Sequence, residues 1–201
     1  MDTLITDFYS NSSVDNCPKE NKPEYAFIGR SNVGKSSLIN MIVNKKIAYT
    51  SSKPGKTQLI NHIAINNEWA LVDLPGYGYA KLAKKKRLEI LTMTKKYLTH
   101  RGVQLVGVFM LIDIRIKAQK IDLEWMKWMV QNNIYFIRIF TKCDSMNKNK
   151  ILKQIENHDQ TMKENHWAKI PETIITSSKN KTGKKEILAK INELNLFFQN
   201  I

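Results

Sequence analysis

Short apolar runs alternate with amphipathic stretches along this chain of 201 residues from Pro23 onward. The apolar runs are rich in β-branched and aromatic residues, which favours strands. We expect strands at Tyr25–Ile28, Leu59–Ile65, Trp69–Val72, Val106–Ile112, Ile134–Phe140 and Thr173–Ile175. Stretches with helical spacing follow most of them, at Lys35–Val43, Leu82–Leu98, Asp122–Gln131, Lys148–Glu164 and Lys184–Leu196. Strand followed by helix, repeated, predicts an α/β domain with helices on both faces of a mostly parallel sheet.

The strand pattern predicts a six-stranded sheet with one antiparallel edge strand. Only Leu59–Ile65 and Trp69–Val72 lack a helix between them, and Asn66-Asn67 favours a tight hairpin turn there. Residues 1–22 are polar and irregular in pattern, so we expect them to pack on the domain as loop. Residues 23–201 then form a single domain, with ligands bound beyond the carboxyl ends of the strands.

Composition narrows the class of protein further. No apolar run approaches the roughly 20 residues of a membrane-spanning helix, since the longest is Leu105–Ile112. The N-terminus has no basic and apolar leader pattern, so we expect a cytoplasmic protein without membrane attachment. Cys17 and Cys143 cannot form a disulfide framework, and the four histidines share no metal-ligand spacing. The sequence therefore predicts no structural zinc site.

The charge balance is unusually positive. Lysine and arginine number 32 against 18 acidic residues, which gives a formal net charge of +14. Such a surface attracts polyanions, and nucleic acid is the commonest polyanion in the cytosol. A generally lysine-rich proteome would produce the same excess, so the charge suggests a nucleic-acid partner without establishing one.

The first loop after a strand matches the phosphate-loop pattern Gly-x4-Gly-Lys-Ser. Its backbone N–H groups and the following helix N-terminus can wrap a phosphate, with Lys35 on the β- and γ-phosphates and Ser36 on Mg²⁺. The alternative is a Gly-rich turn with a solvated lysine. The residues assigned to nucleotide binding are Gly29, Arg30, Ser31, Asn32, Val33, Gly34, Lys35, Ser36 and Ser37. The sheet is therefore predicted to be that of a P-loop NTPase.

The sequence Asp73-Leu74-Pro75-Gly76 ends the third predicted strand. A carboxylate at this place can hold Mg²⁺ through water, and the N–H of Gly76 can face the γ-phosphate. Asp-x-x-Gly is common in proteins, but its place at a strand end downstream of a phosphate loop makes the prediction specific. We therefore assign Asp73 to the metal, together with Ser36, and the whole segment to the nucleotide.

Two later strand ends carry residues suited to a guanine base. An Asp at position 144 can accept both N1–H and N2–H₂ of guanine, while the stem of Lys142 covers the base face. The backbone N–H groups after the sixth strand can face guanine O6. The residues are Thr141, Lys142, Cys143 and Asp144, then Thr176, Ser177 and Ser178. In order and in register, they predict GTP or GDP as the bound nucleotide.

At these residues the chain resembles the EngB family of translation-factor-related GTPases. The resemblance runs from about Pro23 to Leu196 and is carried by Gly29–Asn40, Lys53–Gln58 and Asp73–Ala80. It implies that Thr57 is the switch I threonine, joining Ser36 on Mg²⁺. It also implies that a run of residues lines the triphosphate, namely Gly55, Lys56, Thr57, Gln58 and Leu59. Cys143 stands where the family more usually has alanine, a change that should leave base specificity intact.

Catalysis is expected to rest on Lys35, Thr57 and Gly76 and to be slow. Many GTPases place a glutamine directly after Asp-x-x-Gly to orient the attacking water, and this chain has Tyr77 there. A phenol cannot hold water as an amide does. Asn32 is similar to the asparagine that coordinates K⁺ in related GTPases, although it could equally cap the loop.

The run Lys81–Arg87 follows the Asp73–Gly76 motif and is basic. A charge run is usually a solvated helix face, but this one sits where nucleotide state could gate it. The family resemblance implies a role in assembly of the large ribosomal subunit, and hence in growth and division, with rRNA phosphates on this run. Lys45-Lys46 and Lys179–Lys185 are weaker candidates. Trp125, Trp128 and Met129 share one helix face and are expected to pack against the sheet rather than stack on bases.

Two other functions remain open from the residues. A nucleotide or nucleoside kinase could use the same phosphate loop, but the chain has only five scattered arginines and carries the Thr-Lys-Cys-Asp base reader. A scaffold of cell division or septation would need extra helical domains or a membrane anchor, and neither pattern is present. We expect no DNA specificity, and a monomer.

Overall fold

The described part of the computed structural model, residues 3–48, 58–78 and 82–200, is built around one sheet of seven strands. The spatial order of the strands is β1-β3-β4-β2-β5-β6-β7. In chain order they are β1 (Ile5–Asn11), β2 (Glu24–Gly29), β3 (Ile60–Ile65), β4 (Trp69–Asp73), β5 (Leu105–Asp113), β6 (Phe136–Thr141) and β7 (Thr173–Ile175). The α-helices are α1 (Lys35–Val43), α2 (Lys84–His100), α3 (Lys120–Gln131), α4 (Lys148–Glu164) and α5 (Lys184–Phe198). Short 3-10 helices are η1 (Val14–Asn16), η2 (Gly102–Gln104) and η3 (Cys143–Ser145).

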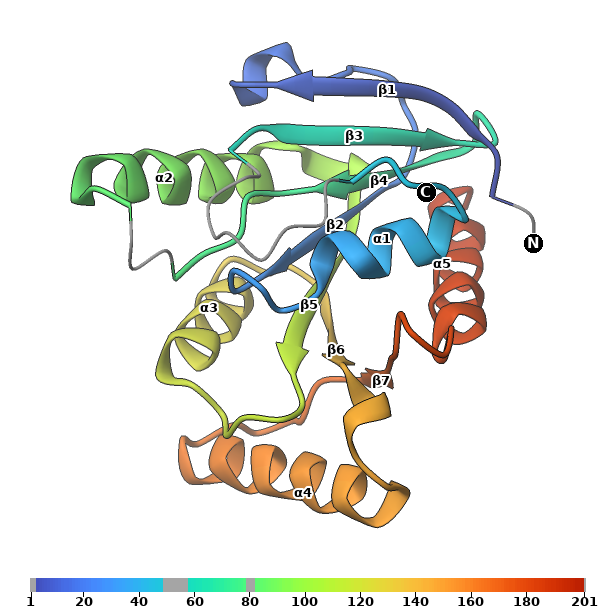
Figure 1. Ribbon diagram of the computed structural model, residues 1–201. Coiled ribbons are helices and arrows are strands. Elements are labelled where there is room, and N and C mark those ends of the chain that lie inside the picture. Colours follow the sequence, from blue (N-terminus) through green and yellow to red (C-terminus); the bar gives the residue numbers. More distant parts are fainter. Residues whose placement is uncertain (1–2, 49–57, 79–81, 201) are drawn as a thin grey trace.

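The helices form a layer on each face of the sheet (Figure 1). Alternation along β2 shows the two cores: Ala26 and Ile28 pack with α2, α3 and α4, whereas Tyr25 and Phe27 pack with α1 and α5. All six residues of β2 are buried, because the central parallel strands are covered on both faces. The α/β fold with three layers that the sequence predicts is therefore confirmed.

The prediction of six strands with the antiparallel one at the edge is wrong. The hairpin at Asn66 and Asn67 is present, with φ of 52° and 57° at the two residues, so β3 runs antiparallel to β4. However, β3 is an inner strand, because β1 pairs with its other side, also antiparallel. The edge strand is thus β1, from the segment that the sequence indicates as irregular.

The strand β1 escapes prediction because it has no apolar face. Its five inner residues are all exposed, and its stability comes from the ladder that joins Asp7 to Ala64 and continues to Asn11 opposite Ile60. After it, Val14 and Cys17 are buried against the α2 side of the core. An alternation of buried and exposed residues is the usual strand signal, and here it is missing.

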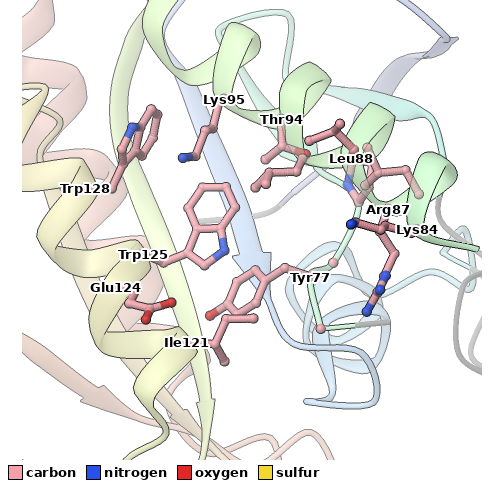
Figure 2. A pocket seen from close by; sticks show the side chains of 15 residues that line it. Tyr77, Lys84, Arg87, Leu88, Thr94, Lys95, Ile121, Glu124, Trp125 and Trp128 are labelled. Atoms are coloured by element: carbon pink, nitrogen blue, oxygen red, sulfur yellow. The ribbon is translucent and has the colours of Figure 1, made fainter. Parts of the chain in front are cut away.

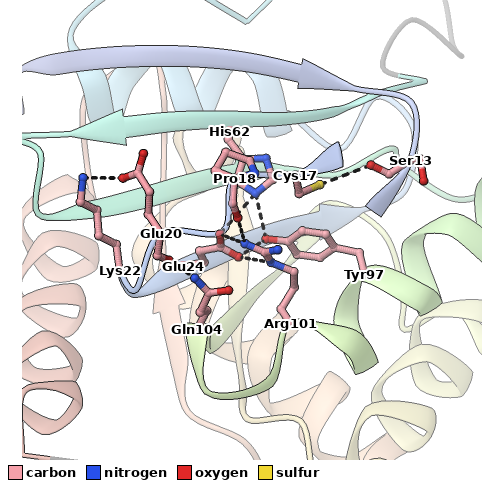
Figure 3. A network of polar contacts seen from close by, with 10 residues as sticks. All are labelled: Ser13, Cys17, Pro18, Glu20, Lys22, Glu24, His62, Tyr97, Arg101 and Gln104. Atoms are coloured by element: carbon pink, nitrogen blue, oxygen red, sulfur yellow. Dashed lines mark hydrogen bonds and ion pairs between the residues drawn. The ribbon is translucent and has the colours of Figure 1, made fainter. Parts of the chain in front are cut away.

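A buried polar cluster ties the N-terminal segment, β3 and the end of α2 to the first residue of β2 (Figure 3). The Glu24 carboxylate accepts hydrogen bonds from Arg101 (Nε, 2.8 Å) and Tyr97 (Oη, 2.5 Å), and His62 Nε2 lies 3.4 Å away. Arg101 also donates to the carbonyl of Pro18. Burial alone raises the pKa of Glu24, but the hydrogen bonds from His62, Arg101 and Tyr97 outweigh it and lower the pKa to about 2.

The helix predictions hold within a few residues, and α1 and α4 match in full. None of the helices in the described ranges combines the length and apolar character that crossing a membrane requires.

Candidate nucleotide-binding site

The phosphate loop leaves β2 at Gly29 and enters α1 at Lys35. A Cβ at Gly29 would lie 2.9 Å from Val33 Cγ1 and 3.0 Å from Leu111, so glycine is required for the loop to fold back over β5. Gly34 precedes the helix with φ of +104°, a backbone conformation that glycine adopts without strain. The sequence pattern thus produces a loop that ends directly on a helix N-terminus.

Lys35 and Asp73, which the sequence assigns to phosphate and Mg²⁺, meet at this loop. The Lys35 ammonium forms an ion pair with Asp73 Oδ1, and both side chains are buried, at 8% and 4% exposed. They meet because β2 and β4 are parallel neighbours, with Phe27 in register with Asp73. Ser36 follows on the first turn of α1 and is half-buried, as is Ser37.

The chain after Asp73 runs along the phosphate loop. The N–H of Tyr77 donates to the Gly29 carbonyl (3.1 Å), and the N–H of Ser31 donates to the Tyr77 carbonyl (3.1 Å). Leu74, Pro75 and Gly76 are buried between these contacts and β4. A displacement of either segment therefore moves the other.

The side chain of Tyr77 turns toward α3 instead of the loop. Its hydroxyl donates to Asp122 Oδ1 (2.8 Å), and its ring stacks on Trp125 with centroids 5.2 Å apart. Arg30 of the phosphate loop reaches the same carboxylate, with Nε 3.2 Å from Asp122 Oδ2. Burial, followed by the Asp122 charge, raises the pKa of Tyr77 well above its ordinary value. The phenol is therefore neutral and engaged with the helix.

Thr141, the last residue of β6, and Lys142 both form hydrogen bonds to the phosphate loop. Thr141 Oγ1 donates to the Val33 carbonyl (2.6 Å), and Lys142 Nζ donates to the Asn32 carbonyl (2.6 Å). Lys142 has φ of 63°, which directs its side chain back across the loop. Asn32 itself has φ of 63° and is exposed. The base-reading and phosphate-binding segments that the sequence predicts thus lie side by side.

Asp113 belongs to the same cluster of loops, and sequence reasoning misses it. It ends β5 and accepts hydrogen bonds from Lys142 Nζ (2.8 Å) and from Arg115 Nε (2.9 Å) and Nη2 (2.8 Å). Burial raises its pKa, but the Arg115 and Lys142 hydrogen bonds prevail and lower it to about 2. The sequence signal is the position of Asp113. It is a carboxylate at the end of a strand, and the neighbouring strands β2 and β6 both end in predicted nucleotide-binding loops.

Asp144 is held by Ser177, whose Oγ donates to Asp144 Oδ1 (2.7 Å). The sequence predicts a backbone role for Ser177, and the structure adds this side-chain contact. The N–H of Cys143 donates to the Thr176 carbonyl (3.1 Å), which joins the two loops a second time. The Cys143 thiol is buried, and burial raises its pKa. Ser178 follows, half-buried, in the turn that begins there.

Gly183 was also missed, although it shapes the same loop. It precedes α5 with φ of +82°, and a Cβ there would meet the Ile175 carbonyl oxygen at 2.4 Å and Thr176 Cγ2 at 2.6 Å. The signal was a glycine directly before a predicted helix.

The predicted triphosphate-lining run is only partly described. Gly55, Lys56 and Thr57 lie outside the described residues, so the predicted switch I threonine is not placed. Gln58 and Leu59 are exposed and lead directly into β3.

The fold and these connected loops define the class as a P-loop GTPase domain. The model of the 50S ribosome-binding GTPase family matches residues 24–142. The chain is 55% identical over 187 residues to the probable GTP-binding protein EngB of Flavobacterium johnsoniae, covering 92% of this chain and 89% of that one. The chain therefore belongs to the EngB family of GTP-binding proteins, within the 50S ribosome-binding GTPases.

Solved structures agree on the fold. A crystal structure of a probable GTP-binding protein EngB matches with a TM-score of 0.67 at 22% identity, over 86% of this chain and 98% of that one. A structure of Era with MgGDPNP and nucleotides 1506–1542 of 16S ribosomal RNA also matches with a TM-score of 0.67, at 21% identity, over 86% of this chain and 56% of that one.

Proposed function

We propose that the protein binds GTP and GDP at the carboxyl edge of its sheet and acts as a slow GTPase switch in assembly of the large ribosomal subunit. The observation that supports the proposal is the junction of Thr141 and Lys142 with the phosphate loop, because it joins the segment predicted to bind phosphate to the segment predicted to bind the base. Asp144, fixed by Ser177, reads the guanine N1–H and N2–H₂. The remaining assigned residues of the four loops line the same nucleotide.

Oxygen ligands at the phosphate loop suit Mg²⁺. Ser36 offers a hydroxyl and Asp73 a carboxylate, the donor types that Mg²⁺ prefers, with water completing its shell. Thr57 is proposed as the third protein residue at the metal. When bound, Mg²⁺ neutralises charge on the phosphate oxygens. Lys35 is already beside Asp73 and supplies the second positive charge on the β- and γ-phosphates.

Hydrolysis is proposed to be slow because the residue after Gly76 cannot orient water. The Tyr77 hydroxyl is bound to Asp122, and its ring lies against Trp125. Lys35, Thr57 and the N–H of Gly76 then act by stabilising charge on the phosphate. Coordination of K⁺ by Asn32 would add to that stabilisation. GTPase rates in KCl and NaCl at matched ionic strength test the K⁺ role, and equal rates would exclude it.

The ribosomal partner is supported by the family and by charge. The N-terminal end of α2 presents Lys84, Lys85, Lys86 and Arg87, all exposed. Four adjacent cations suit rRNA phosphates, and the affinity they confer falls with salt. We propose that the chain acts as a cytoplasmic monomer of one domain, and that its loss impairs growth and division through the ribosome.

Co-sedimentation with isolated ribosomal subunits tests the proposal. The protein is loaded with GDP or a non-hydrolysable GTP analogue, and binding is followed across a salt series. We expect selective, salt-resistant binding to the large subunit in the GTP-analogue state. Binding that ignores both subunit and nucleotide, and that disappears with salt, would leave only a charged surface and refute the switch. Fluorescent GDP and ADP binding to wild type and Asp144→Asn checks base reading separately, and the substitution should abolish the preference for GDP.

A further inference from the structure

A cavity of about 430 Å³ lies between α2 and α3, beside the chain that follows Asp73 (Figure 2). It shares only Pro75 and Gly76 with the proposed nucleotide site. Its walls are the Pro75–Gly78 segment on one side, α2 on the second and α3 on the third. A volume of this size falls in the range of small-ligand pockets and accommodates one nucleotide unit.

The α3 wall is aromatic. Trp125 is 5% exposed and packs between Tyr77 and Trp128, whose ring meets it edge-on with centroids 5.6 Å apart. Trp128 is only partly buried, and Lys95 Nζ from α2 lies 4.8 Å from its ring centroid. The sequence expectation of packing is thus met by Trp125, whereas Trp128 also presents ring surface to the cavity. A flat indole flanked by a cation suits a planar, electron-rich ring.

The α2 wall holds a buried hydroxyl that the protein does not satisfy. Thr94 is 2% exposed and lines the cavity, yet its Oγ1 has no hydrogen-bond partner among the described residues. A helical threonine normally donates to a carbonyl of the preceding turn. Leaving a buried hydroxyl unbonded is costly. Because Thr94 Oγ1 is itself sealed from solvent, a ligand in the cavity bonds it once the Thr94 side chain rotates toward the cavity.

The rim carries mostly positive charge. Lys84 and Arg87 are exposed where α2 begins, and Lys95 lies deeper. Among the described residues of the lining, Glu124 is the one acidic side chain. The cavity therefore combines a ring-stacking wall, an unsatisfied hydroxyl and cations at its mouth. An unpaired nucleotide has the matching parts: a π-face, polar edges and a phosphate.

We propose that this cavity binds one unpaired nucleotide of RNA, with its base against Trp128, a base-edge atom on the Thr94 hydroxyl and its phosphate at Lys84 and Arg87. The inference deepens the proposed function, on which it rests, by naming the form of RNA that the switch region recognises. A phenylalanine side chain in an acidic peptide has the ring and the charge but no polar ring-edge atom for the Thr94 hydroxyl.

The cavity is also placed to report nucleotide state. Its wall includes Gly76, which is proposed to face the γ-phosphate, and Tyr77, whose backbone bonds the phosphate loop at both N–H and carbonyl. A shift of this segment changes the shape of the cavity mouth. RNA capture and GTP occupancy are therefore coupled through the single stretch Pro75–Gly78.

The test uses the full chain and a decamer of uridines with one central 2-aminopurine, whose fluorescence falls when it stacks on an indole. We expect quenching with the GTP analogue bound, weaker quenching with GDP, and no quenching for the decamer mixed with Trp128→Ala. Binding of the decamer, followed by anisotropy, should weaken about tenfold or more in Trp128→Ala. A decamer in which every nucleotide is abasic should bind wild type as weakly as the intact decamer binds Trp128→Ala.

Thr94→Val separates a ligand role from a structural one. The valine has the same shape without the hydroxyl, so it should raise the melting temperature of the free protein and yet weaken the decamer several-fold. Lys84→Gln should weaken decamer binding more than Lys150→Gln does. Lys150 is an exposed lysine on α4, so its replacement makes the same change of charge away from the cavity. Equal effects of these two lysine variants would mean that the contact is general electrostatics, and would overturn the proposal.

Failure of the inference can be told from failure of the proposed function. Each variant is first checked for binding of fluorescent GDP. If GDP binds and the large subunit is recognised but the decamer is neither quenched nor base-dependent, the cavity proposal alone is wrong. If GDP does not bind to wild type, the proposed function fails first. The third result is displacement of the protein from the large subunit by an acidic phenylalanine-containing peptide but not by the decamer. That result would assign the cavity to a protein partner and overturn the RNA proposal.

Discussion

Replacing Gly183 with alanine tests whether the guanine-side loop depends on a close approach that only glycine allows. An alanine at φ of +82° costs about 1 kcal/mol in backbone strain. Its Cβ would also lie 2.4 Å from the Ile175 carbonyl oxygen, so β7 or α5 must shift. Overpacking of this kind adds about 1–3 kcal/mol. We therefore expect a loss of about 2–4 kcal/mol in the free energy of unfolding.

Gly102→Ala is the matched control for that experiment. Gly102 has φ of +57°, and a Cβ there meets nothing within 4 Å, so only the backbone term applies. Urea unfolding followed by circular dichroism gives the free energies, and fluorescent GDP gives the affinities. Gly183→Ala should lower the melting temperature by roughly 5–15 °C, against about 2–4 °C for Gly102→Ala. Only Gly183→Ala should weaken the binding of GDP. Equal losses in the two variants would refute the argument from close approach.

Three further predictions concern single contacts. Because folding lowers the pKa of Glu24 from 4.5 to about 2, its carboxylate stabilises the fold above pH 4.5, and this stabilisation is lost as the pH falls toward 2. Glu24→Gln should lower the free energy of unfolding by about 3 kcal/mol near pH 7, because Arg101 loses its charged partner. In the variant this free energy should also depend less on pH between pH 4.5 and about 2. Ser177→Ala should weaken GDP about tenfold in fluorescence titrations, by freeing Asp144; an unchanged affinity would contradict the role of that hydrogen bond. Tyr77→Phe should leave the GTPase rate within about twofold, measured as phosphate release, while costing about 1 kcal/mol in chemical unfolding; a tenfold slower rate would place the phenol in catalysis.

The order of strands and helices could be predicted because each central element carries its own signal. The strand β5 is a continuous apolar run, and Lys35–Val43 follows a glycine loop, so local pattern and tertiary role agree. The strand β1 could not be predicted, because its inner residues are exposed and its pairing with β3 joins residues 49 to 60 positions apart along the chain. Non-local pairing without burial leaves no periodic trace in a sequence.

The candidate site divides in the same way. Motif residues such as Lys35 and Asp73 were predicted from spacing, and the structure brings them together. Asp113 and Gly183 were missed because their roles depend on what lies beside them in space: the Lys142 ammonium for Asp113, and the Ile175 carbonyl for Gly183. A carboxylate at a strand end or a glycine before a helix marks a position in the sequence, but only its neighbours in space define the contact it makes.

The buried cluster around Glu24 gives α2 one fixed end. Tyr97 and Arg101 clamp its C-terminal turn to β2 and to the N-terminal segment, while Lys84, at the other end, is exposed beside the cavity. Seventeen residues at 1.5 Å each make a rod of about 25 Å. A tilt of about 10° about the clamp would carry the free end some 4 Å and leave the far end in place. Hydrogen bonds to the Glu24 carboxylate thus anchor the end of α2 that lies away from the cavity.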